Sequence, residues 1–299
     1  MSEQQFRSGV VAVIGRPNVG KSTLINRVVG EKVTIVSNKA QTTRRRILGI
    51  ANTDDYQIAF VDTPGMHSPH DRLGKALNEV ARTSVQDVDL LLIMVDGSQR
   101  PGRDEARVAD VVKAQQNMEG KRLLVLNKMD KLKPQYVESN YNAYCELFEV
   151  EDCIMTSLTK DQNVDILLNT IIQALPEGPP HFDQDSITDQ SMRSLAAELI
   201  REKVLHLTKE EVPHAVATYI EEWAETDEGL EINAVILVER EGQKGIVIGK
   251  KGQMLKEIGT AARKEINEMI GRKAHLNLFV KVRKDWRQSE RHLKELDLI

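Results

Sequence analysis

A glycine-bearing segment near the start of the chain has the residue types and the spacing that hold phosphate groups. It spells G-x-x-x-x-G-K-S, from Gly15 to Ser22. The two glycines let successive backbone N–H groups turn toward phosphate oxygens, where a Cβ atom would block close approach. Lys21 brings a cation to the outer phosphates, and the Ser22 hydroxyl suits Mg²⁺. The residues expected to bind the nucleotide here are Gly15, Arg16, Pro17, Asn18, Val19, Gly20, Lys21, Ser22 and Thr23.

The flanks of this segment place it between a strand and a helix. Apolar residues 10–14 precede it, and residues 24–29 have the spacing of an amphipathic helix. A helix that begins here directs the positive end of its dipole at a bound anion. The alternative is a strand-to-helix turn that binds nothing, and the flanking pattern argues against it.

A second segment is suited to selecting the base. Asn127-Lys128-Met129-Asp130 follows the apolar strand expected at residues 122–126. The Asp130 carboxylate can accept hydrogen bonds from the ring N–H and the exocyclic amine of guanine, donors that adenine does not present there. With adenine the charge would stay desolvated and unpaired, so such a site rejects adenine strongly. We expect Asn127, Lys128 and Asp130 to bind a guanine nucleotide.

A third segment is suited to a metal ion and to the terminal phosphate. Asp62-Thr63-Pro64-Gly65 ends the strand expected at residues 58–61. The Asp62 carboxylate is placed to hold Mg²⁺ through water, and the Gly65 N–H can contact a γ-phosphate and lose that contact on hydrolysis. The residues expected at the nucleotide from this segment are Asp62, Thr63, Pro64 and Gly65.

Residues 38–46 lie between the first helix and the next strand and contain two adjacent threonines. The hydroxyl of either Thr42 or Thr43 can complete the shell of a Mg²⁺ ion held by Ser22 and Asp62. The basic run Arg44-Arg45-Arg46 is either a solvated face or a contact for phosphate or RNA. We expect residues 38–46 and 62–71 to be ordered by GTP and Mg²⁺ and to relax with GDP.

Strands and helices alternate through the first part of the chain. Apolar runs predict strands at residues 10–14, 58–61, 90–95, 122–126 and 154–155. Helical periodicity is found at residues 73–85, 106–114, 137–147 and 164–175. This alternation predicts a mostly parallel sheet with helices on both faces, whose ligands bind at the carboxyl ends of the strands. We expect an α/β P-loop GTPase domain over residues 1–175 and a proline-rich linker over residues 176–190.

Beyond the prolines the pattern changes to helix, strand, strand, helix, strand. The helices are expected at residues 194–207 and 254–270, and the strands at residues 215–223, 230–238 and 275–282. A G-x-x-G loop with two lysines precedes the second helix, as in a KH module that clamps single-stranded RNA. An ordinary loop with solvated lysines is the alternative. The residues expected to bind RNA are Ile248, Gly249, Lys250, Lys251, Gly252 and Lys256.

The distribution of charge supports a polyanionic partner for the second part. The 299-residue chain has a net charge of -4, yet residues 239–299 hold 15 Lys and Arg against 9 Asp and Glu. The basic end therefore lies on an acidic body. No apolar run is long enough to cross a bilayer, and residues 1–8 are polar and lack a signal-peptide core. Cys145 and Cys153 fit neither a metal site nor a disulfide framework.

Taken together, the motifs carry a resemblance to a known family. The segments at 15–22, 62–65 and 127–130 resemble the G motifs of a translation-factor-class GTPase, with Ser157-Leu158-Thr159 in place of the usual Ser-Ala-x. This G domain, followed by a smaller α+β type II KH domain over residues 191–299, resembles the Era family of bacterial GTPases from residue 6 to residue 286. The resemblance implies that Ser157 and Leu158 contact the nucleotide. It also favours Thr43 over Thr42 as the metal ligand.

The resemblance implies catalysis by Lys21, Thr43 and Gly65, with one departure from the Ras-like scheme. Met66 follows Gly65 where a glutamine would orient the attacking water. The neighbouring His67 is a weaker candidate for a base, because a lone polar residue in a loop is more often solvated. An apolar residue here, together with Asn18, is similar to GTPases that use K⁺ beside the phosphates. We expect slow hydrolysis with Mg²⁺, with K⁺ as a second candidate cation held by Asn18.

The family resemblance also implies partners and a location. These are GTP and GDP, the 3′ end of small-subunit ribosomal RNA, and the small ribosomal subunit, whose maturation the protein would assist. A monomer in the cytoplasm is expected, with peripheral contact to the cell membrane as a candidate. The alternative function is an RNA-binding scaffold with a regulatory, barely hydrolytic nucleotide site. A tRNA-modifying relative would have a cysteine motif at the C-terminus, and a tandem GTPase would have a second P-loop.

Overall fold

The computed structural model describes residues 5–39, 41–69, 71–114, 121–227 and 229–299. Residues 40 and 70, which belong to the two segments expected to respond to the nucleotide, lie outside the described residues. The chain divides into two compact units. The first comprises Met1–Thr34, Thr43–His70 and Gly74–Asp189, and the second comprises Ile35–Thr42, Asp71–Leu73 and Gln190–Ile299.

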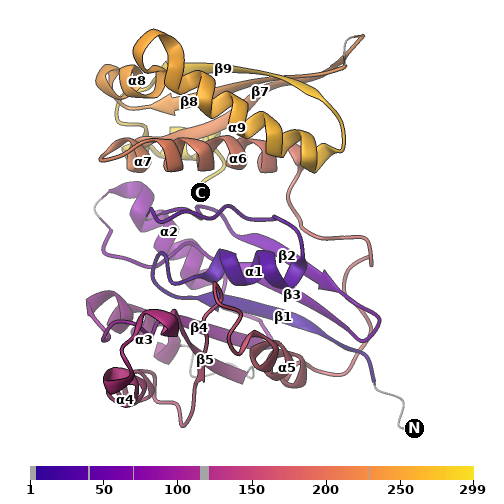
Figure 1. Ribbon diagram of the computed structural model, residues 1–299, viewed down its shortest axis with the longest axis vertical. Coiled ribbons are helices and arrows are strands. Elements are labelled where there is room, and N and C mark those ends of the chain that lie inside the picture. The colour runs from indigo at the N-terminus through magenta and orange to yellow at the C-terminus, as the bar shows by residue number, and fades with distance from the viewer. Residues whose placement is uncertain (1–4, 40, 70, 115–120, 228) are drawn as a thin grey trace. The chain divides into compact units, whose positions relative to one another are not determined.

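A six-stranded sheet forms the centre of the first unit, with the order β2-β3-β1-β4-β5-β6 (Figure 1). Its strands are β1 (Arg7–Ile14), β2 (Ile47–Asn52), β3 (Tyr56–Asp62), β4 (Leu90–Asp96), β5 (Lys121–Asn127) and β6 (Ile154–Met155). The helices that accompany them are α1 (Lys21–Val29), α2 (Arg72–Thr83), α3 (Arg103–Ala114), α4 (Val137–Phe148) and α5 (Val164–Ala174). All neighbouring strands are parallel except β2 and β3. The expected mostly parallel sheet is confirmed.

Both faces of this sheet are covered by helices. Val11 and Val13 of β1 belong to a core that includes residues of α1 and α5, whereas Ala12 and Ile14 belong to one that includes residues of α2, α3 and α4. Successive side chains of a strand point to opposite faces, so a strand with two covered faces is a continuous apolar run. This is why the inner strands were recognisable in the sequence.

Strand β2 was not among the expected strands. It pairs antiparallel with β3 at one edge of the sheet. Its outer side is bonded by the chain that follows the prolines: the Ile50 N–H donates to the Ile187 carbonyl at 2.9 Å, and the Leu48 N–H donates to the Asp189 carboxylate at 3.0 Å. The segment expected as a linker therefore runs along the first unit as far as Asp189.

The second unit contains a three-stranded sheet with the order β7-β8-β9. Its strands are β7 (Ala217–Thr226), β8 (Gly229–Val238) and β9 (Ala274–Val282). Its helices are α6 (Met192–Leu207), α7 (Val212–Ala215), α8 (Glu241–Ile248), α9 (Gln253–Ile270) and α10 (Glu290–Glu295). Strands β7 and β8 are antiparallel, and β8 and β9 are parallel. The expected order is confirmed, with α7, α8 and α10 as additions that the sequence did not predict.

One face of the smaller sheet packs against helices. Ile232, Ala234 and Ile236 of β8 are fully buried in a core that includes residues of α6, α8 and α9. Because β8 and β9 are parallel, the chain must cross from one end of the sheet to the other between them. Helix α8, residues 249–252 and helix α9 supply this crossover. The lysine-bearing loop thus lies in the middle of the connection that leads to the edge strand β9.

None of the helices in the described parts of the chain is both long enough and apolar enough to cross a membrane.

Candidate functional site

The segment from Gly15 to Ser22 forms a tight loop between β1 and α1. A Cβ atom at Gly15 would lie 2.1 Å from the Met94 carbonyl oxygen, and one at Gly20 would lie 2.4 Å from the Asn127 side-chain nitrogen. Gly20 also has a φ of 116°, in the region that favours glycine. Both glycines are therefore required by close packing against β4 and β5, as well as by any ligand.

Lys21 lies folded over this loop. Its Nζ donates to the carbonyls of Gly15 and Arg16, each at 3.1 Å, and the residue is buried. Burial lowers the pKa of Lys21 to about 8, although the nearby Asp62 carboxylate acts in the opposite direction. Phosphate oxygens would be better acceptors for this ammonium than carbonyls, because a charged partner offsets desolvation of the cation.

Three hydroxyls converge on the Asp62 carboxylate. Oδ2 accepts from Ser22 at 2.8 Å, from Thr34 at 2.8 Å and from Thr43 at 3.2 Å. Ser22 Oγ and Thr43 Oγ1 are themselves 3.1 Å apart. Asp62 is fully buried, and its Oδ1 accepts no hydrogen bond within the described residues. Burial raises the pKa of Asp62, against the effect of Lys21 and of the three hydroxyls.

This cluster fits Mg²⁺. A carboxylate and two hydroxyls are hard oxygen ligands, and Mg²⁺ is usually held by one or two carboxylates together with substrate phosphates. The buried Oδ1 of Asp62, which has no partner among the described residues, is an acceptor that a hydrated cation would satisfy. A positive charge here would also favour the ionised form of a carboxyl group that burial disfavours.

The structure separates the two adjacent threonines. Thr43 reaches Ser22 and Asp62, whereas the Thr42 hydroxyl donates to the Lys39 carbonyl at 2.7 Å. The basic run after them is not a uniformly solvated face, because Arg44 is 3% exposed.

Gly65 lies against the phosphate-binding loop. A Cβ atom there would come within 2.6 Å of the Pro17 Cα atom. Met66 is buried and packs into the core on one face of the sheet. Its side chain therefore cannot orient a water molecule. The His67 Nδ1 atom lies 3.2 Å from the Gly65 carbonyl oxygen, so this ring is close to the segment.

Asn127 ties the base-selecting segment to the phosphate-binding loop. Its Nδ2 donates to the Val19 carbonyl at 2.7 Å, and its Oδ1 accepts from the Leu158 N–H at 3.2 Å. On the side of Leu158 this contact uses only the backbone N–H, which explains how a leucine can occupy the position where the usual pattern has alanine. The structure thus brings residues 15–22, Asn127 and Leu158 together.

The charged side chains of the base-selecting segment, Lys128 and Asp130, have different partners. Asp130 is exposed, and its Oδ1 accepts from the Ser157 hydroxyl at 2.6 Å. Lys128 has a φ of 64° and its Nζ lies 2.9 Å from Asp96 Oδ2. Ser157 thereby fixes Asp130, while the Lys128 ammonium pairs with Asp96. An exposed, oriented carboxylate is what recognition of a guanine edge requires.

The G-x-x-G loop of the second unit has a conformation that glycine allows. Gly249 has φ 71° and ψ 175°, and a Cβ atom there would lie 2.6 Å from the Met254 Cβ atom. Lys250 and Lys251 between the glycines are exposed, and Lys251 also has a positive φ of 53°. The loop therefore presents two cations at the start of α9.

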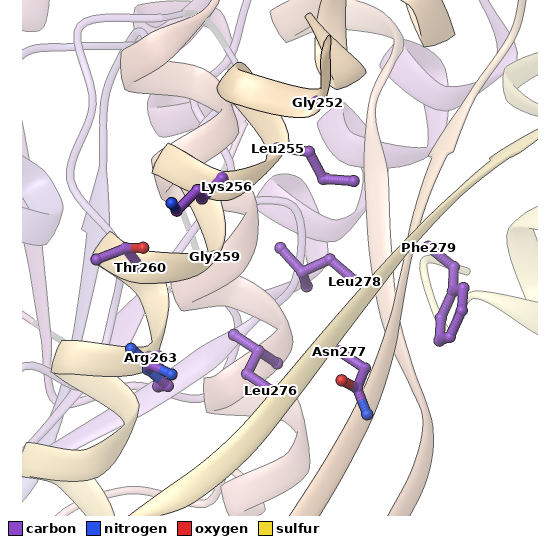
Figure 2. Close-up of a pocket in the computed structure, with 10 residues that line it drawn as sticks. All are labelled: Gly252, Leu255, Lys256, Gly259, Thr260, Arg263, Leu276, Asn277, Leu278 and Phe279. Carbon is purple, nitrogen blue, oxygen red and sulfur yellow. The ribbon is translucent and has the colours of Figure 1, made fainter.

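A groove of about 550 Å³ runs from this loop along α9 and β9. Figure 2 shows Leu255, Leu276 and Leu278 between the helix and the strand, and Phe279 on the other side of the strand. The rim on α9 carries Lys256, Thr260 and Arg263. An apolar floor with a cationic rim suits bases and phosphates of a single strand.

Sequence reasoning missed several residues of these sites. Thr34 and Arg263 belong to no motif, and their roles depend on what the fold brings near them. Arg263 carried a usable signal, since it lies seven residues after Lys256 and thus on the same face of a helix. Thr34 carried none, because its partner is 28 residues away in the chain.

Comparisons with known proteins agree with this geometry. Residues 10–128 match a family model described as 50S ribosome-binding GTPase, and residues 211–287 match that of the KH domain. The chain is 47% identical to GTPase Era of Geobacter metallireducens over 298 residues, which is 99% of each chain. It is 44% identical to GTPase Era of Geotalea uraniireducens over 296 residues, again 99% of each.

Two solved structures match nearly the whole chain. One is Era in complex with MgGDPNP and nucleotides 1506–1542 of 16S ribosomal RNA, with a TM-score of 0.92 and 40% identity. The other is an Aquifex aeolicus Era variant bound to GDP and AlF4⁻, with a TM-score of 0.92 and 41% identity. Each match covers 98% of this chain and 99% of the other.

Proposed function

Since this chain belongs to the Era family of GTPases, we propose that it binds GTP, hydrolyses it to GDP and phosphate, and binds small-subunit ribosomal RNA near its 3′ end. In this role it assists assembly and maturation of the small ribosomal subunit. The observation that carries the proposal is the 2.7 Å hydrogen bond from Asn127 to the Val19 carbonyl, which unites the base-selecting segment with the phosphate-binding loop. The relative solved with MgGDPNP and a 16S RNA fragment supports both ligands.

In the proposed mechanism, Ser22, Thr43 and Asp62 would hold Mg²⁺. Bound at these oxygens, the ion would neutralise negative charge on the outer phosphates of GTP. Lys21 gives its N–H donors to the β- and γ-phosphate oxygens in place of the loop carbonyls that it contacts now. The backbone N–H groups of residues 15–23, apart from Pro17, which has none, surround the same phosphates and exclude water from them.

Hydrolysis is proposed to be slow without further help. Gly65 offers a backbone N–H to the γ-phosphate, and Lys21 and Thr43 stabilise the transferring group. Met66 is buried in the core, so no side chain at that position orients the attacking water. We propose K⁺ beside the phosphates, near Asn18, as a second activating cation. This burial of Met66 also favours the runner-up function, an RNA-binding scaffold whose nucleotide site is barely hydrolytic.

Guanine selection is proposed for Asp130, supported by Asn127, Lys128, Ser157 and Leu158. The Asp130 carboxylate accepts from the ring N–H and the amine of guanine while Ser157 keeps it oriented. Replacing Asp130 by Asn exchanges one acceptor for a donor. The Asp130→Asn variant should therefore lose affinity for GDP and gain affinity for xanthosine diphosphate, which has a carbonyl in place of the amine.

RNA binding is proposed for the groove of the second unit. Ile248, Gly249, Lys250, Lys251, Gly252 and Lys256 clamp the sugar–phosphate backbone of a short single-stranded segment. Bases lie against Leu255, Leu276 and Leu278, which form the apolar floor. We further propose a G domain and a type II KH domain as the two functional modules, with the monomer acting in the cytoplasm and contacting the membrane peripherally.

The deciding experiment is an RNA-binding titration with the full chain. An oligonucleotide with the sequence of the 3′ end of 16S ribosomal RNA is titrated in the presence of GDP or of a non-hydrolysable GTP analogue. Binding that favours the GTP analogue and is lost in the double variant Lys250→Asp with Lys251→Asp supports a GTP-switched RNA-binding protein. Equal affinity with both nucleotides would contradict the switch, and no binding in either state would contradict the RNA partner.

A further inference from the structure

Thr34 lies outside the nucleotide-binding motifs, yet its hydroxyl bonds the same oxygen of the Asp62 carboxylate as the hydroxyls of Ser22 and Thr43. It donates to Asp62 Oδ2 at 2.8 Å, as does Ser22, while Thr43 donates from 3.2 Å. Thr34 is 3% exposed and Asp62 is 0% exposed, so water does not compete for this bond. A hydrogen bond to a charged, desolvated acceptor is among the stronger ones in proteins.

Asn26 of helix α1 fixes the backbone at Thr34. The Asn26 Oδ1 atom accepts from the N–H groups of Val33 and Thr34, each at 3.0 Å. Its Nδ2 donates to the Thr34 carbonyl at 2.7 Å. One side chain thus satisfies three backbone groups around residue 34, which leaves the Thr34 hydroxyl little freedom to turn away from Asp62. Helix α1 also begins with Lys21 and Ser22, so one rigid element positions both the phosphate ligands and the anchor of Thr34.

The three hydroxyls on Asp62 differ in their other tasks. Ser22 and Thr43 are adjacent to each other and form part of the proposed metal shell. Thr34 belongs to none of the nucleotide-binding motifs, and Asn26 fixes its backbone while its hydroxyl donates to Asp62. Of the three, Thr34 is therefore the one that the proposed metal shell does not include.

We infer that Thr34 is a positioning residue for Mg²⁺: it holds the Asp62 carboxylate by Oδ2, leaves Oδ1 for the hydrated ion, and thereby sets how tightly Mg²⁺ and the guanine nucleotide are retained. This inference rests on the proposed nucleotide binding and adds a residue that no motif of the sequence contains. A threonine that merely completed the core would contribute to the stability of the fold and would leave the response to Mg²⁺ unchanged.

The test measures the release of fluorescent mant-GDP from the full chain across a range of Mg²⁺ concentrations. Thr34→Val keeps the shape of the side chain and removes the hydroxyl. The Mg²⁺ concentration that half-slows release should rise about tenfold, which corresponds to about 1.4 kcal/mol. Thr34→Ser restores the hydroxyl and should stay within about twofold of the parent chain.

A second arm keeps the test valid if Thr34→Val folds poorly. Asn26→Ala should shift the Mg²⁺ response in the same direction, and it should add little in the Thr34→Val background, because both changes act through one contact. Unfolding by urea, measured for each variant without nucleotide, separates a loss of stability from the change in Mg²⁺ response.

Three results would overturn the inference. One is a release curve for Thr34→Val that superimposes on that of the parent chain at every Mg²⁺ concentration. Another is a Thr34→Ser variant that behaves like Thr34→Val, since the hydroxyl would then not be responsible. If the parent chain itself fails to bind mant-GDP, the proposed function fails together with the inference, and this outcome is distinct from the other two.

Discussion

The side-chain amide of Asn127 donates to the Val19 backbone carbonyl at 2.7 Å, across 108 positions of the chain. This bond joins the end of β5 to the phosphate-binding loop. The Oδ1 atom of the same Asn127 side chain accepts from the Leu158 N–H. One amide group thus holds three segments of the nucleotide site in register. A substitution at Asn127 should therefore weaken the contacts to the base and to the phosphates together.

Asn127→Asp is expected to weaken GDP binding by roughly tenfold or more. The substitution keeps the shape of the side chain but replaces the donor with an anion that faces the Val19 carbonyl, and a buried unpaired acceptor costs about 1–3 kcal/mol. Fluorescence titration with mant-GDP measures the change. Asn163→Asp is a matched control, because Asn163 also donates to a backbone carbonyl, that of Met155, at an exposed site. Equal losses in both variants would contradict the assigned role.

Nucleotide binding is expected to take up a proton near pH 8.5. Burial lowers the pKa of Lys21 from 10.5 to about 8 in the chain without nucleotide. Near pH 8.5 the Lys21 amine is therefore neutral in a fraction of the molecules. Phosphate groups favour the charged form and should raise this pKa on binding. Calorimetry in buffers of different ionisation enthalpy should report uptake of up to about one proton per GDP. Lys21→Met should abolish it, and uptake that persists in this variant would assign the proton to another group.

The same pKa sets the sign of a stability change. Between about pH 8 and 10.5 the unfolded chain binds more protons at Lys21 than the folded chain does. The contribution of Lys21 to the free energy of unfolding therefore rises with pH in this window, while below about pH 8 the full cost of burying the cation is present. Without nucleotide, Lys21→Met should be more stable than the parent chain at pH 7, and urea unfolding should show this difference shrink toward pH 10.

Arg263→Gln is expected to weaken binding of the ribosomal RNA oligonucleotide, and Lys264→Gln is not. Both residues are exposed on α9 and carry the same charge, but Arg263 lines the groove and Lys264 does not. Loss of one phosphate contact on a single strand should reduce the salt dependence of binding by about 0.7 in log–log slope. Titrations at several KCl concentrations measure this. Equal effects of the two variants would mean that the RNA senses only the overall charge of the helix.

Gly249→Ala is expected to destabilise the second unit, whereas Gly252→Asn is expected to be tolerated. The φ and ψ of Gly249 lie in a region that is essentially restricted to glycine, and a Cβ atom would lie 2.6 Å from the Met254 Cβ atom. Gly252 has φ 78° and ψ 8°, which asparagine can adopt, and its Cβ position is open. Urea unfolding should show a loss of about 1–3 kcal/mol for the first variant alone.

GTP hydrolysis is expected to be faster in KCl than in NaCl at matched ionic strength. Met66 is buried, so the site lacks a side chain at that position to help the attacking water, and a cation beside the phosphates would stabilise the developing charge. Phosphate release measured over time gives the two rates. Asn18→Asp should alter the preference between the ions, and equal rates for the parent chain in both salts would remove K⁺ from the mechanism.

Most residues of the candidate nucleotide site could be proposed from the sequence because they lie in short segments with fixed spacing. The loop at residues 15–22 and the segment at residues 127–130 each follow a buried strand, and parallel strands bring their carboxyl ends to one edge of the sheet. Thr34 could not be predicted in this way. The fold brings its hydroxyl to Asp62, and no local sequence pattern predicts this contact.

The missed elements of the fold also have physical explanations. Strand β2 is buried along most of its length, so it shows no alternation of apolar and polar residues. Helix α8 contains Gly242 and Gly245, which have low helix propensity, so the sequence has little helical signal there. The prolines after residue 175 indicate the end of a helix correctly, yet they do not reveal that the chain beyond them bonds to β2.

That bonding has a consequence for the integrity of the sheet. Strand β2 is an edge strand, and an unpaired edge offers its N–H and C=O groups to strands of other molecules. Residues 187–189 occupy part of this edge, through the contacts to Leu48 and Ile50. The segment after the prolines thus hinders edge-to-edge aggregation. A first domain truncated at residue 175 would expose the unpaired edge of β2, whereas one that ends after Asp189 would keep part of that edge covered.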